Sequence, residues 1–451
     1  MKIGSVNYSI KSQTGLRFDA SFHLSEALVV KRKIASSPYG LLSIKDVTSS
    51  IFYGNRIRRV YVSDREHGIP FLSSSDILQA DLENVKLASR KHTTCIEEMK
   101  LQKGWTLISR SGTIGNCAFA NAKHAQKLAS EDVIRVIPNN ILRGGLIYAY
   151  LASNSGHSLL TQGTFGAVIQ HIEPDFVASL PIPKFPEYFQ QEVDDLIQES
   201  ARLREEAADA LEEAHHLIES RFNIASKKKS SCVSIKSIMS SHNKRFEAFY
   251  HTSTNRSVYD YITSNFEYKL LGDLTTRIFR PGIFKREYVS NGVTFLGGAD
   301  ILMAIPSSEK KLSFRQVEKM PELKVKKDWI LVTCGGTIGN TVLIDRQLEQ
   351  CVVSQHVMRV VPKDDILKGY LYAVLSSTIG KELITMFTTG SVIPQIEAHH
   401  LELVPIPLLE KEQMEKIDEL VSTYVSKIEI SKEKETRAIS MVEQEIEKWN
   451  N

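Results

Sequence analysis

The sequence of 451 residues repeats itself, and this duplication constrains the fold more than any other feature. The stretch WTLISRSGTIGN at 105–116 returns as WILVTCGGTIGN at 329–340, with seven identities in twelve positions. From Phe71 onward the matched segments keep an offset of 224, as in SEDVIRVIP at 130–138 and SQHVMRVVP at 354–362. A register kept over such distances indicates two copies of one folded module, each of about 225 residues.

Each copy begins as a mixture of short strands and ends in a long helix. Short β-rich runs such as WTLIS and DVIRVIP, separated by Gly, Ser and Asn turns, continue to the PIP segments at 181–183 and 405–407. In residues 187–222 apolar side chains recur every seven positions, which is typical of a coiled-coil seam. A second, less regular helix is predicted from about Glu410 to Trp449. The residues predicted to form the seam are Leu196, Leu203, Leu217, Ile417, Val421 and Ile428.

We therefore expect an α+β protein with two similar mixed α/β domains, each followed by a long helix. The two helices are expected to pair as an antiparallel coiled coil, which gives the chain a pseudo-twofold relation. The predicted boundaries are 1–185 for the first domain, 186–225 for the first helix, 226–240 for a lysine-rich linker, 241–408 for the second domain and 409–451 for the second helix.

Composition places the chain among folded proteins, with 42% hydrophobic and 24% charged residues. A net charge of +3 does not by itself indicate a polyanionic partner, so the distribution of charge has to decide. The cysteines are odd in number and scattered, which argues against a disulfide framework or a zinc site and fits a reducing compartment. Without a signal-peptide core or an apolar stretch of membrane-spanning length, the sequence predicts a cytoplasmic protein that does not contact membranes.

The two glycine-rich repeats do not complete a nucleotide-binding motif, and other enzyme motifs are missing from the sequence as well. Neither copy of Gly-Thr-Ile-Gly-Asn is followed by the Lys-Ser/Thr pair of a P-loop, and the dinucleotide pattern of three glycines is also missing. The sequence also lacks the zinc-protease, serine-hydrolase, kinase and amino-methyltransferase signatures. We therefore predict no catalytic and no metal-binding residues. The glycines are expected to allow a tight turn at positive φ, and backbone contact with DNA phosphate is the alternative.

Positive charge gathers at matching places in the two copies. SSIFYGNRIRRVYV at 49–62 and TTRIFRPGIFKREYV at 275–289 both interleave cations with aromatic residues, and both follow a matched start, KDVT or GDLT. Arginine binds phosphates and also guanine edges, so equivalent segments with different side chains suit two independent DNA-recognition sites. The alternative is a solvated basic hairpin. The predicted DNA-binding residues are Arg56, Arg58, Arg59, Arg277, Arg280, Lys285 and Arg286.

The order of these motifs resembles the specificity (S) subunit of type I restriction-modification systems. The motifs that carry the resemblance are RF(D/E)A near the start of each half, F-L-x-x-x-D-I-L, W-x-L-(I/V)-x-x-x-G-T-I-G-N, a Q-x-I-E type segment, and PIP before a long helix. The resemblance covers essentially the whole chain and implies two target recognition domains, which bind DNA, and two helical spacers. In this family the spacers pack antiparallel and dock two methyltransferase (modification) subunits, and a restriction subunit joins as nuclease and translocase.

The resemblance further implies a non-catalytic subunit that directs its partners to double-stranded DNA at a bipartite, asymmetric site. It assigns S-adenosylmethionine to the modification subunit and ATP to the restriction subunit, with Mg also in the partner subunits, so that this chain itself binds no cofactor. The first half has SIKDV where the second has the more usual LGD, and Arg110 is replaced by Cys334, so residue roles are not carried between halves. Two alternatives stay open: a specificity subunit that works with a fused methyltransferase-nuclease, and a duplicated coiled-coil scaffold that never binds DNA.

Overall fold

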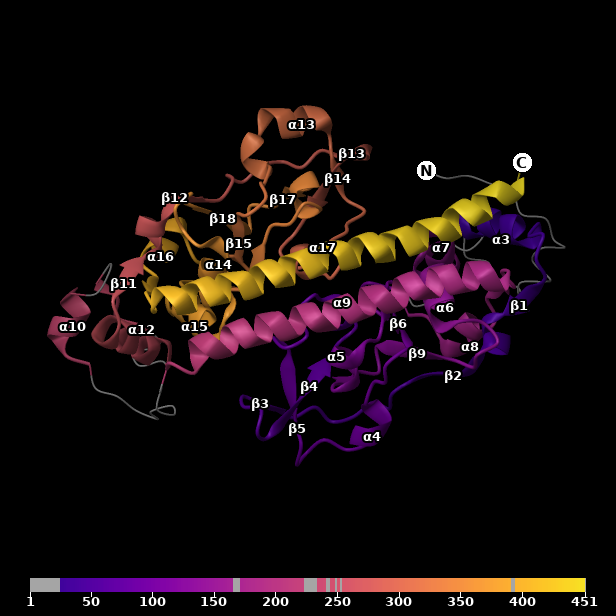
Figure 1. Ribbon diagram of the computed structural model, residues 1–451, viewed down its shortest axis with the longest axis horizontal. Helices are drawn as coiled ribbons and strands as arrows, with labels where there is room; N and C mark the ends of the chain where they lie inside the picture. The colour runs from indigo at the N-terminus through magenta and orange to yellow at the C-terminus, as the bar shows by residue number, and fades with distance from the viewer. Residues whose placement is uncertain are drawn as a thin grey trace. The chain divides into compact units, whose positions relative to one another are not determined.

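The computed structural model describes residues 25–164, 171–222, 233–240, 244–247, 250–251, 254–390 and 394–450 (Figure 1). The chain forms two compact units: unit 1 contains Met1–Glu205 and Ile430–Asn451, and unit 2 contains Glu206–Glu429. This division passes through both long helices, whereas the boundaries predicted from the sequence place each helix after its domain. The first RF(D/E)A motif, at residues 17–20, and residues 226–232 of the predicted linker lie outside the described residues, while α10 (Ile235–Ser240) falls inside that linker.

Unit 1 is a mixed α/β unit, as predicted. Its strands are β1 (Leu41–Ser43), β2 (Thr48–Tyr53), β3 (Tyr61–Val62), β4 (Gly68–Leu72), β5 (Lys86–Ser89), β6 (Thr106–Ser109), β7 (Cys117–Phe119), β8 (Leu128–Ala129), β9 (Val133–Pro138) and β10 (Pro181–Pro183). Its shorter helices are α3 (Ala27–Ala35), α4 (Ile96–Met99), α5 (Ala122–Ala125), α6 (Gly144–Ala152), α7 (Asn154–Gln162) and α8 (Pro174–Ala178), with 3-10 turns η1 (Ile44–Val47) and η2 (Asp76–Leu78). One sheet has the antiparallel order β2-β9-β6-β7, and a second has the order β3-β5-β4-β8, in which β4 and β8 run parallel.

Unit 2 repeats this plan. Its strands are β11 (Tyr268–Leu270), β12 (Thr275–Phe279), β13 (Tyr288–Leu296), β14 (Lys311–Leu312), β15 (Ile330–Thr333), β16 (Thr341–Leu343), β17 (Val352–Val353), β18 (Val357–Pro362) and β19 (Pro405–Pro407). Its shorter helices are α12 (Thr254–Asn265), α13 (Phe314–Lys319), α14 (Lys368–Ser376), α15 (Thr378–Met386) and α16 (Ala398–Glu402), with 3-10 turns η4 (Leu271–Leu274), η5 (Asp300–Leu302), η6 (Pro321–Leu323) and η7 (Leu348–Gln350). The sheets have the orders β12-β18-β15-β16 and β14-β13-β17. The PIP segment forms a strand pair in each unit, β1 with β10 in unit 1 and β11 with β19 in unit 2.

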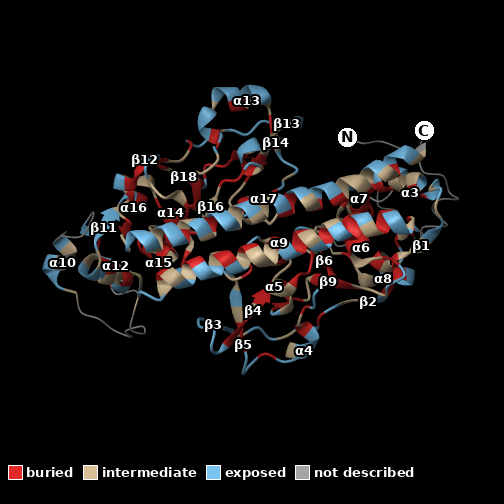
Figure 2. Ribbon diagram, viewed as in Figure 1, coloured by how far each residue is buried: buried red, intermediate tan, exposed pale blue. Residues whose placement is uncertain are grey.

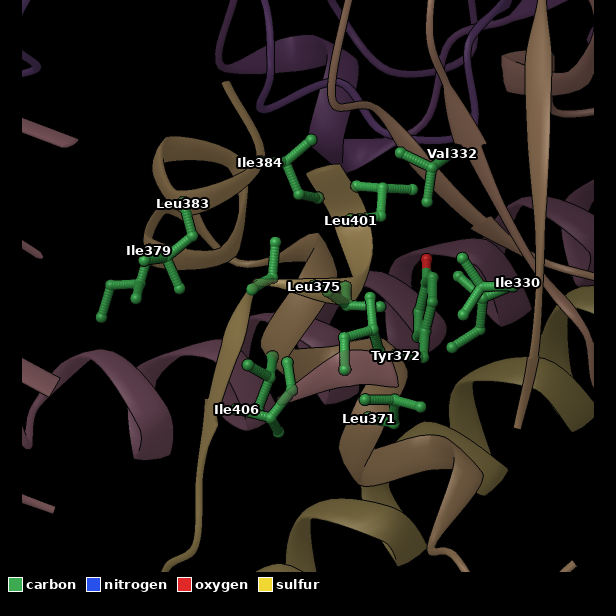
Figure 3. Close-up of a cluster of buried hydrophobic side chains, with 14 of the residues drawn as sticks. Ile330, Val332, Leu371, Tyr372, Leu375, Ile379, Leu383, Ile384, Leu401 and Ile406 are labelled. Carbon is green, nitrogen blue, oxygen red and sulfur yellow. The ribbon is translucent and has the colours of Figure 1, made fainter. Parts of the chain in front are cut away.

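The core of unit 2 lies where α14 and α15 pack on the sheet that contains β15. Figure 3 shows Ile330 and Val332 from β15 together with Leu371 from α14 and Leu383 from α15, all of them fully buried. Leu331, between the two β15 residues, belongs to a separate buried cluster. Because neighbouring side chains of a strand point to opposite faces, the continuous apolar run of β15 covers two cores at once.

Two long helices follow the two mixed regions, as the sequence predicts: α9 (Glu187–Glu219), of 33 residues, and α17 (Lys411–Glu447), of 37 residues, the latter ending in the 3-10 turn η8 (Lys448–Asn450). Figure 2 shows buried residues recurring along both helices between exposed ones. Inside unit 1, Glu192 pairs with Arg437, and the Ser200 hydroxyl donates to the Ser431 carbonyl oxygen, so the segments run in opposite directions. Unit 2 shows the same in its ion pairs Glu206–Lys427 and Glu213–Lys416. The predicted antiparallel pairing is confirmed within each unit.

Candidate nucleic-acid interface

In each unit the predicted basic segment includes a loop that crosses from one sheet to the other. The loop at 54–60 joins β2 to β3 in unit 1, and the loop at 280–287 joins β12 to β13 in unit 2. Among the described strands, the two that flank each loop belong to different sheets. The hairpin geometry of the alternative interpretation is therefore wrong, whereas the structural equivalence of the two segments is confirmed. The interpretation of their cations as solvated, and not DNA-binding, stays an alternative.

Several side chains fix the loop of unit 1. Ile57 is turned inwards and packs against the small apolar cluster that contains Phe71. Arg59 lies over the Phe71 ring, 5.5 Å from its centroid, and pairs with Glu131 at an Nη2–Oε1 distance of 2.7 Å. The hydrogen bond to Glu131 raises the pKa of Arg59 above its usual value. Tyr61 packs edge-on against the same ring, with 6.2 Å between centroids.

The loop of unit 2 is fixed by residues at the corresponding positions. Phe284 packs edge-on against Phe295, with 6.3 Å between ring centroids. Arg286 lies 5.4 Å from the Phe295 centroid and donates to Gln355 Oε1 at 3.4 Å, while Tyr288 packs against Phe295 at 6.2 Å. In the register of the duplication, each of these residues matches one with the same role in unit 1. The two loops therefore share one frame.

Other positions of the basic segments are presented to solvent. Arg56, Arg58 and Lys285 are exposed, and 92% of the Arg56 side chain is accessible. Arg277, also exposed, lies on β12 over the ring of Phe279 at 4.0 Å. Arg59 and Arg286 are exposed as well, but their contacts make them anchors of the loops. Two of the four outward residues also lie near an acid, Arg56 at 3.8 Å from Glu131 and Arg277 at 3.6 Å from Glu322.

The first residue of the unit 2 loop is engaged in an ion pair. Arg280 Nη2 donates to Glu397 Oε1 at 2.6 Å, and both side chains are about two-thirds buried. In unit 1 the equivalent acid, Glu173, pairs instead with Arg110 at 2.5 Å, and Arg110 lies 4.3 Å from the ring centroid of Tyr53. Arg280 occupies the position of Tyr53, and a cysteine occupies the position of Arg110. The ion pair is thus kept while its arginine comes from a different strand end.

The Gly-Thr-Ile-Gly-Asn repeats form the turns of two hairpins, β6 to β7 and β15 to β16. Gly112 and Gly115 have φ of +75° and +82°, and Gly336 and Gly339 have +79° and +86°. Backbone hydrogen bonds close the turns, as from Gly115 N–H to the carbonyl oxygen of Ser109 at 2.9 Å. The predicted tight turn at positive φ is confirmed. Residues other than glycine rarely adopt this backbone conformation, which explains the glycines at these positions.

The second half of the chain is similar to a known protein family. Residues 233–440 match the family model of the type I restriction modification DNA specificity domain. The match covers a little less than half of the chain. A stretch of 170 residues is also 23% identical to the type I restriction enzyme MjaIX specificity subunit of Methanocaldococcus jannaschii, and it covers 37% of this chain and 38% of that relative. The matched stretch thus spans little more than a third of the relative, and the resemblance inferred from the sequence is confirmed.

Two solved structures of specificity subunits align with most of the chain at low similarity. The S subunit of a type I restriction-modification system from M. genitalium is 13% identical, with 91% of this chain and 96% of that chain covered and a TM-score of 0.34. The HsdS subunit from Thermoanaerobacter tengcongensis is 12% identical, with 91% and 97% covered and a TM-score of 0.28.

A buried arginine ties the two sheets together in each unit. Arg359, on β18, is fully buried and donates to the carbonyl oxygens of Ser354 at 2.9 Å and Val357 at 2.6 Å. Arg135 on β9 makes the equivalent bonds in unit 1, to Val133 and Ala129, both at 2.7 Å. Burial lowers the pKa of each guanidinium to about 10. Carbonyl oxygens are the recorded hydrogen-bond acceptors of both groups, so each cation is held by backbone from both sheets.

The seam of the two long helices is partly out of phase with the prediction. Leu203, Ile417 and Val421 are buried, while Leu196, Leu217 and Ile428 are only half-buried. The neighbouring Ile197 and Ile218 are fully buried instead. The difference arises because α9 packs on the mixed regions as well as on α17, so its buried stripe is wider than a two-helix seam.

The middle of the helix pair contains a buried polar cluster in unit 1. Glu435 of α17 is 4% exposed and accepts hydrogen bonds from Arg204 at 2.6 Å, Ser200 at 3.3 Å and the Tyr148 hydroxyl. Burial and the charge of Glu435 raise the pKa of Tyr148 well above its usual value. A buried ion pair contributes little net stability, but slippage of the helices would leave its charges unpaired. We interpret the cluster as a device that fixes the register of α9 against α17.

Each long helix also caps a short helix of its own copy. Asp194 on α9 accepts from the Gly145 N–H at 2.6 Å, in the first turn of α6. Asp418 on α17 accepts from the Gly369 N–H at 2.7 Å, in the first turn of α14. A carboxylate at a helix N-terminus satisfies unpaired N–H groups and complements the helix dipole.

A second set of caps comes from the helix of the other copy. Glu443 on α17 accepts from the Ser155 N–H of α7 at 2.7 Å, inside unit 1. Glu219 on α9 accepts from the Thr378 N–H of α15 at 2.9 Å, inside unit 2. Glu219 and Glu443 are 224 positions apart, so the capping pattern repeats with the duplication.

Metal-binding groups and membrane-spanning helices are both missing from the described ranges. No group of three or more His, Cys, Asp or Glu could hold a metal ion there. Cys95, Cys117, Cys334 and Cys351 are not joined in disulfide bonds, and burial raises the pKa of Cys334. Within the same part of the chain, no helix combines the length and apolar character that crossing a membrane requires.

Sequence reasoning missed the residues that hold the interface in place. The acids at 173 and 397, the buried arginines at 135 and 359, and the capping acids on the helices were not singled out. A signal for them exists, because each is an identical charged residue at the 224 offset. Identical charged residues that recur at this offset are candidates for buried ion pairs, hydrogen bonds and helix caps.

Proposed function

We propose that this chain is the sequence-specific DNA-binding subunit of a type I restriction-modification complex. In this proposal it directs methyltransferase and restriction subunits to a bipartite, asymmetric DNA site, one element for each unit. The observation that carries the proposal is the pair of inter-sheet loops, which share one set of anchors but present different side chains. The match of residues 233–440 to the specificity-domain family supports it.

The loops suit DNA recognition because their frame is rigid and their outward residues are mostly cationic. In unit 1 Arg56 and Arg58 face solvent, and in unit 2 Arg277 and Lys285 do so. Such side chains bind phosphates or guanine edges, and a fixed loop loses little entropy when it does so. Because the exposed residues differ between units, the two elements of the site should differ in sequence.

The proposal extends to partners that the family is expected to have. The paired helices α9 and α17 would dock two methyltransferase subunits, and a restriction subunit would complete the nuclease. S-adenosylmethionine, ATP and Mg²⁺ would be bound by those partners, and this chain would act in the cytoplasm without catalysing a reaction. A helix of 33 residues is about 50 Å long, so a spacer on this scale can bridge elements one DNA turn, about 34–36 Å, apart.

Methylation mapping of the host genome tests the function directly. We expect a bipartite methylated motif with an unread gap that disappears when this gene is deleted and returns when it is restored. A genome in which deletion leaves every methylated motif unchanged would contradict the proposal. Purification of the tagged chain with its partners tests the alternative of another restriction-modification type. A single fused methyltransferase-nuclease among the partners would indicate that type.

Alanine substitutions test the loops. Arg58→Ala or Lys285→Ala should weaken specific DNA binding by the assembled complex, by about five-fold or more for each lost charged contact. Arg32→Ala on α3 and Lys269→Ala on β11 are matched controls, since both side chains are exposed cations outside the loops. Wild-type affinity and methylation in both loop variants would remove these residues from the interface.

A further inference from the structure

One position of the inter-sheet loops combines full exposure with a change of chemistry between the units. Aligned from β2 and β12, the loops keep an offset of 227, so that Arg56 corresponds to Ile283. The Arg56 side chain is 92% exposed and Ile283 is 94% exposed. We call this pair the tip position.

The tip position stands on a fixed frame in both units. The next residue in each loop, Ile57 or Phe284, packs inwards. On the far side of the tip in unit 2, the side chain of Gln316 from α13 donates to the Lys285 carbonyl oxygen at 2.7 Å and accepts from the Glu287 N–H at 3.0 Å. The Arg280–Glu397 ion pair holds the near side. A rigid loop that presents an isoleucine to water leaves its apolar surface uncovered in the free protein, and a partner group can cover it.

We propose that the tip position reads one base pair in each half of the DNA site. Arg56 would bind the O6 and N7 acceptors of a guanine in the element recognised by unit 1. Ile283 would contact the 5-methyl group of a thymine in the element recognised by unit 2, because this methyl is the apolar group that a base edge presents in the major groove. The cations beside Ile283 attract the phosphate backbone of DNA, so the tip residue only has to discriminate between base pairs. This inference rests on the proposed function and adds two specificity-determining residues to it.

Exchange of the tip residues tests the inference in the assembled complex. Methylated motifs are mapped for the wild type, Arg56→Ile and Ile283→Arg. We expect Arg56→Ile to change the preference at one base pair of one element only, and Ile283→Arg to change one base pair of the other element only. Arg32→Ile and Ile235→Arg, at exposed positions outside the loops, should leave the motif unchanged. Because the tip side chains are exposed, we expect the variants to fold and to co-purify with the methyltransferase at normal yield.

Modified duplexes test the contacts at atomic level. Deoxyuridine in place of the thymine read by unit 2 should weaken wild-type binding about four-fold, the value of one buried methyl, and should not weaken Ile283→Ser further. 7-Deazaguanine in place of the guanine should weaken wild-type binding at least about five-fold and leave Arg56→Ala unaffected.

Several results would overturn the inference. Unchanged motifs in both exchange variants would do so, as would an Arg56 variant that weakens binding equally on all sequences with a smaller salt dependence, which indicates a phosphate contact. Loss of subunit assembly in the Ile283 variants would indicate a protein contact instead. If the wild-type complex itself methylates no bipartite motif, the proposed function fails independently of the tip position.

Discussion

Acid should loosen unit 1 selectively, because a neutral histidine is buried there. His124 lies on α5 with 7% exposure, and its Nδ1 is 2.8 Å from the Asn121 side-chain oxygen. Burial lowers the pKa of His124 from 6.5 to about 4. The unfolded chain therefore takes up a proton near pH 6.5 and the folded chain only near pH 4. Stability that is complete above pH 6.5 is lost as the pH falls towards 4.

The pKa difference sets the size of the effect. Linkage with pKa values of 6.5 and about 4 predicts a loss of about 2 kcal/mol between pH 7 and pH 5, and of about 3 kcal/mol below pH 4. Unit 2 has Leu348 at the corresponding position, fully buried, so His124→Leu installs a side chain that the same framework already accepts. This variant should lose the histidine component of the acid sensitivity.

Hydrogen exchange of the full chain measures the effect in both units at once. Peptides from β6 and β9 report on unit 1, and peptides from β15 and β18 report on unit 2 as an internal control. After correction for intrinsic exchange rates, the opening free energy of unit 1 should fall by about 2 kcal/mol more than that of unit 2 between pH 7 and pH 5. Equal losses in the two units, or the same loss in His124→Leu as in the wild type, would refute the reasoning.

Three further changes probe the seam, the buried cation and the caps. Leu203→Asp places a carboxylate in the buried helix seam and should cost about 3 kcal/mol or more, with loss of co-purifying methyltransferase; normal yield of the complex would count against it. Arg135→Met strands buried carbonyl groups and should lower the unfolding free energy of unit 1 by about 3–5 kcal/mol in denaturant titration, whereas a loss below 1 kcal/mol would show them otherwise satisfied. Glu443→Gln should reduce exchange protection of α7 by about 1 kcal/mol and Glu219→Gln that of α15, and a response in the wrong unit would contradict the assignment.

Local features of the fold could be predicted from the sequence because their causes are local. The apolar repeat in residues 187–222 falls on α9 (Glu187–Glu219), which lies inside the predicted helix at 186–225. Paired glycines predicted the turns after β6 and β15, since the conformation they allow is a property of the residue itself. The alternation of short strands with turns predicted mixed α/β units without revealing which strands share a sheet.

The interface itself depends on contacts between distant residues, and these leave no local pattern. Arg59 and Arg280 look like free cations in the sequence, yet Glu131 and Glu397 hold them. Glu131 lies 72 positions after Arg59, and Glu397 lies 117 positions after Arg280. Only the outward residues of the predicted set, such as Arg58, keep the role in DNA binding that their charge suggested, and that role stays a prediction.

The reciprocal caps show why both copies belong in one chain. Unit 1 takes the cap of α7 from Glu443, which follows the second mixed region in the sequence, and unit 2 takes the cap of α15 from Glu219, which follows the first. Neither copy therefore contains all the residues of a complete unit, because half of each unit's helix pair comes from the other copy. Folding of one unit thus requires the helix of the other copy to be present and in register, and the buried Arg204–Glu435 pair penalises any other register in unit 1. The covalent link between the copies supplies that helix at high local concentration, so the loops of both units are anchored in every folded molecule.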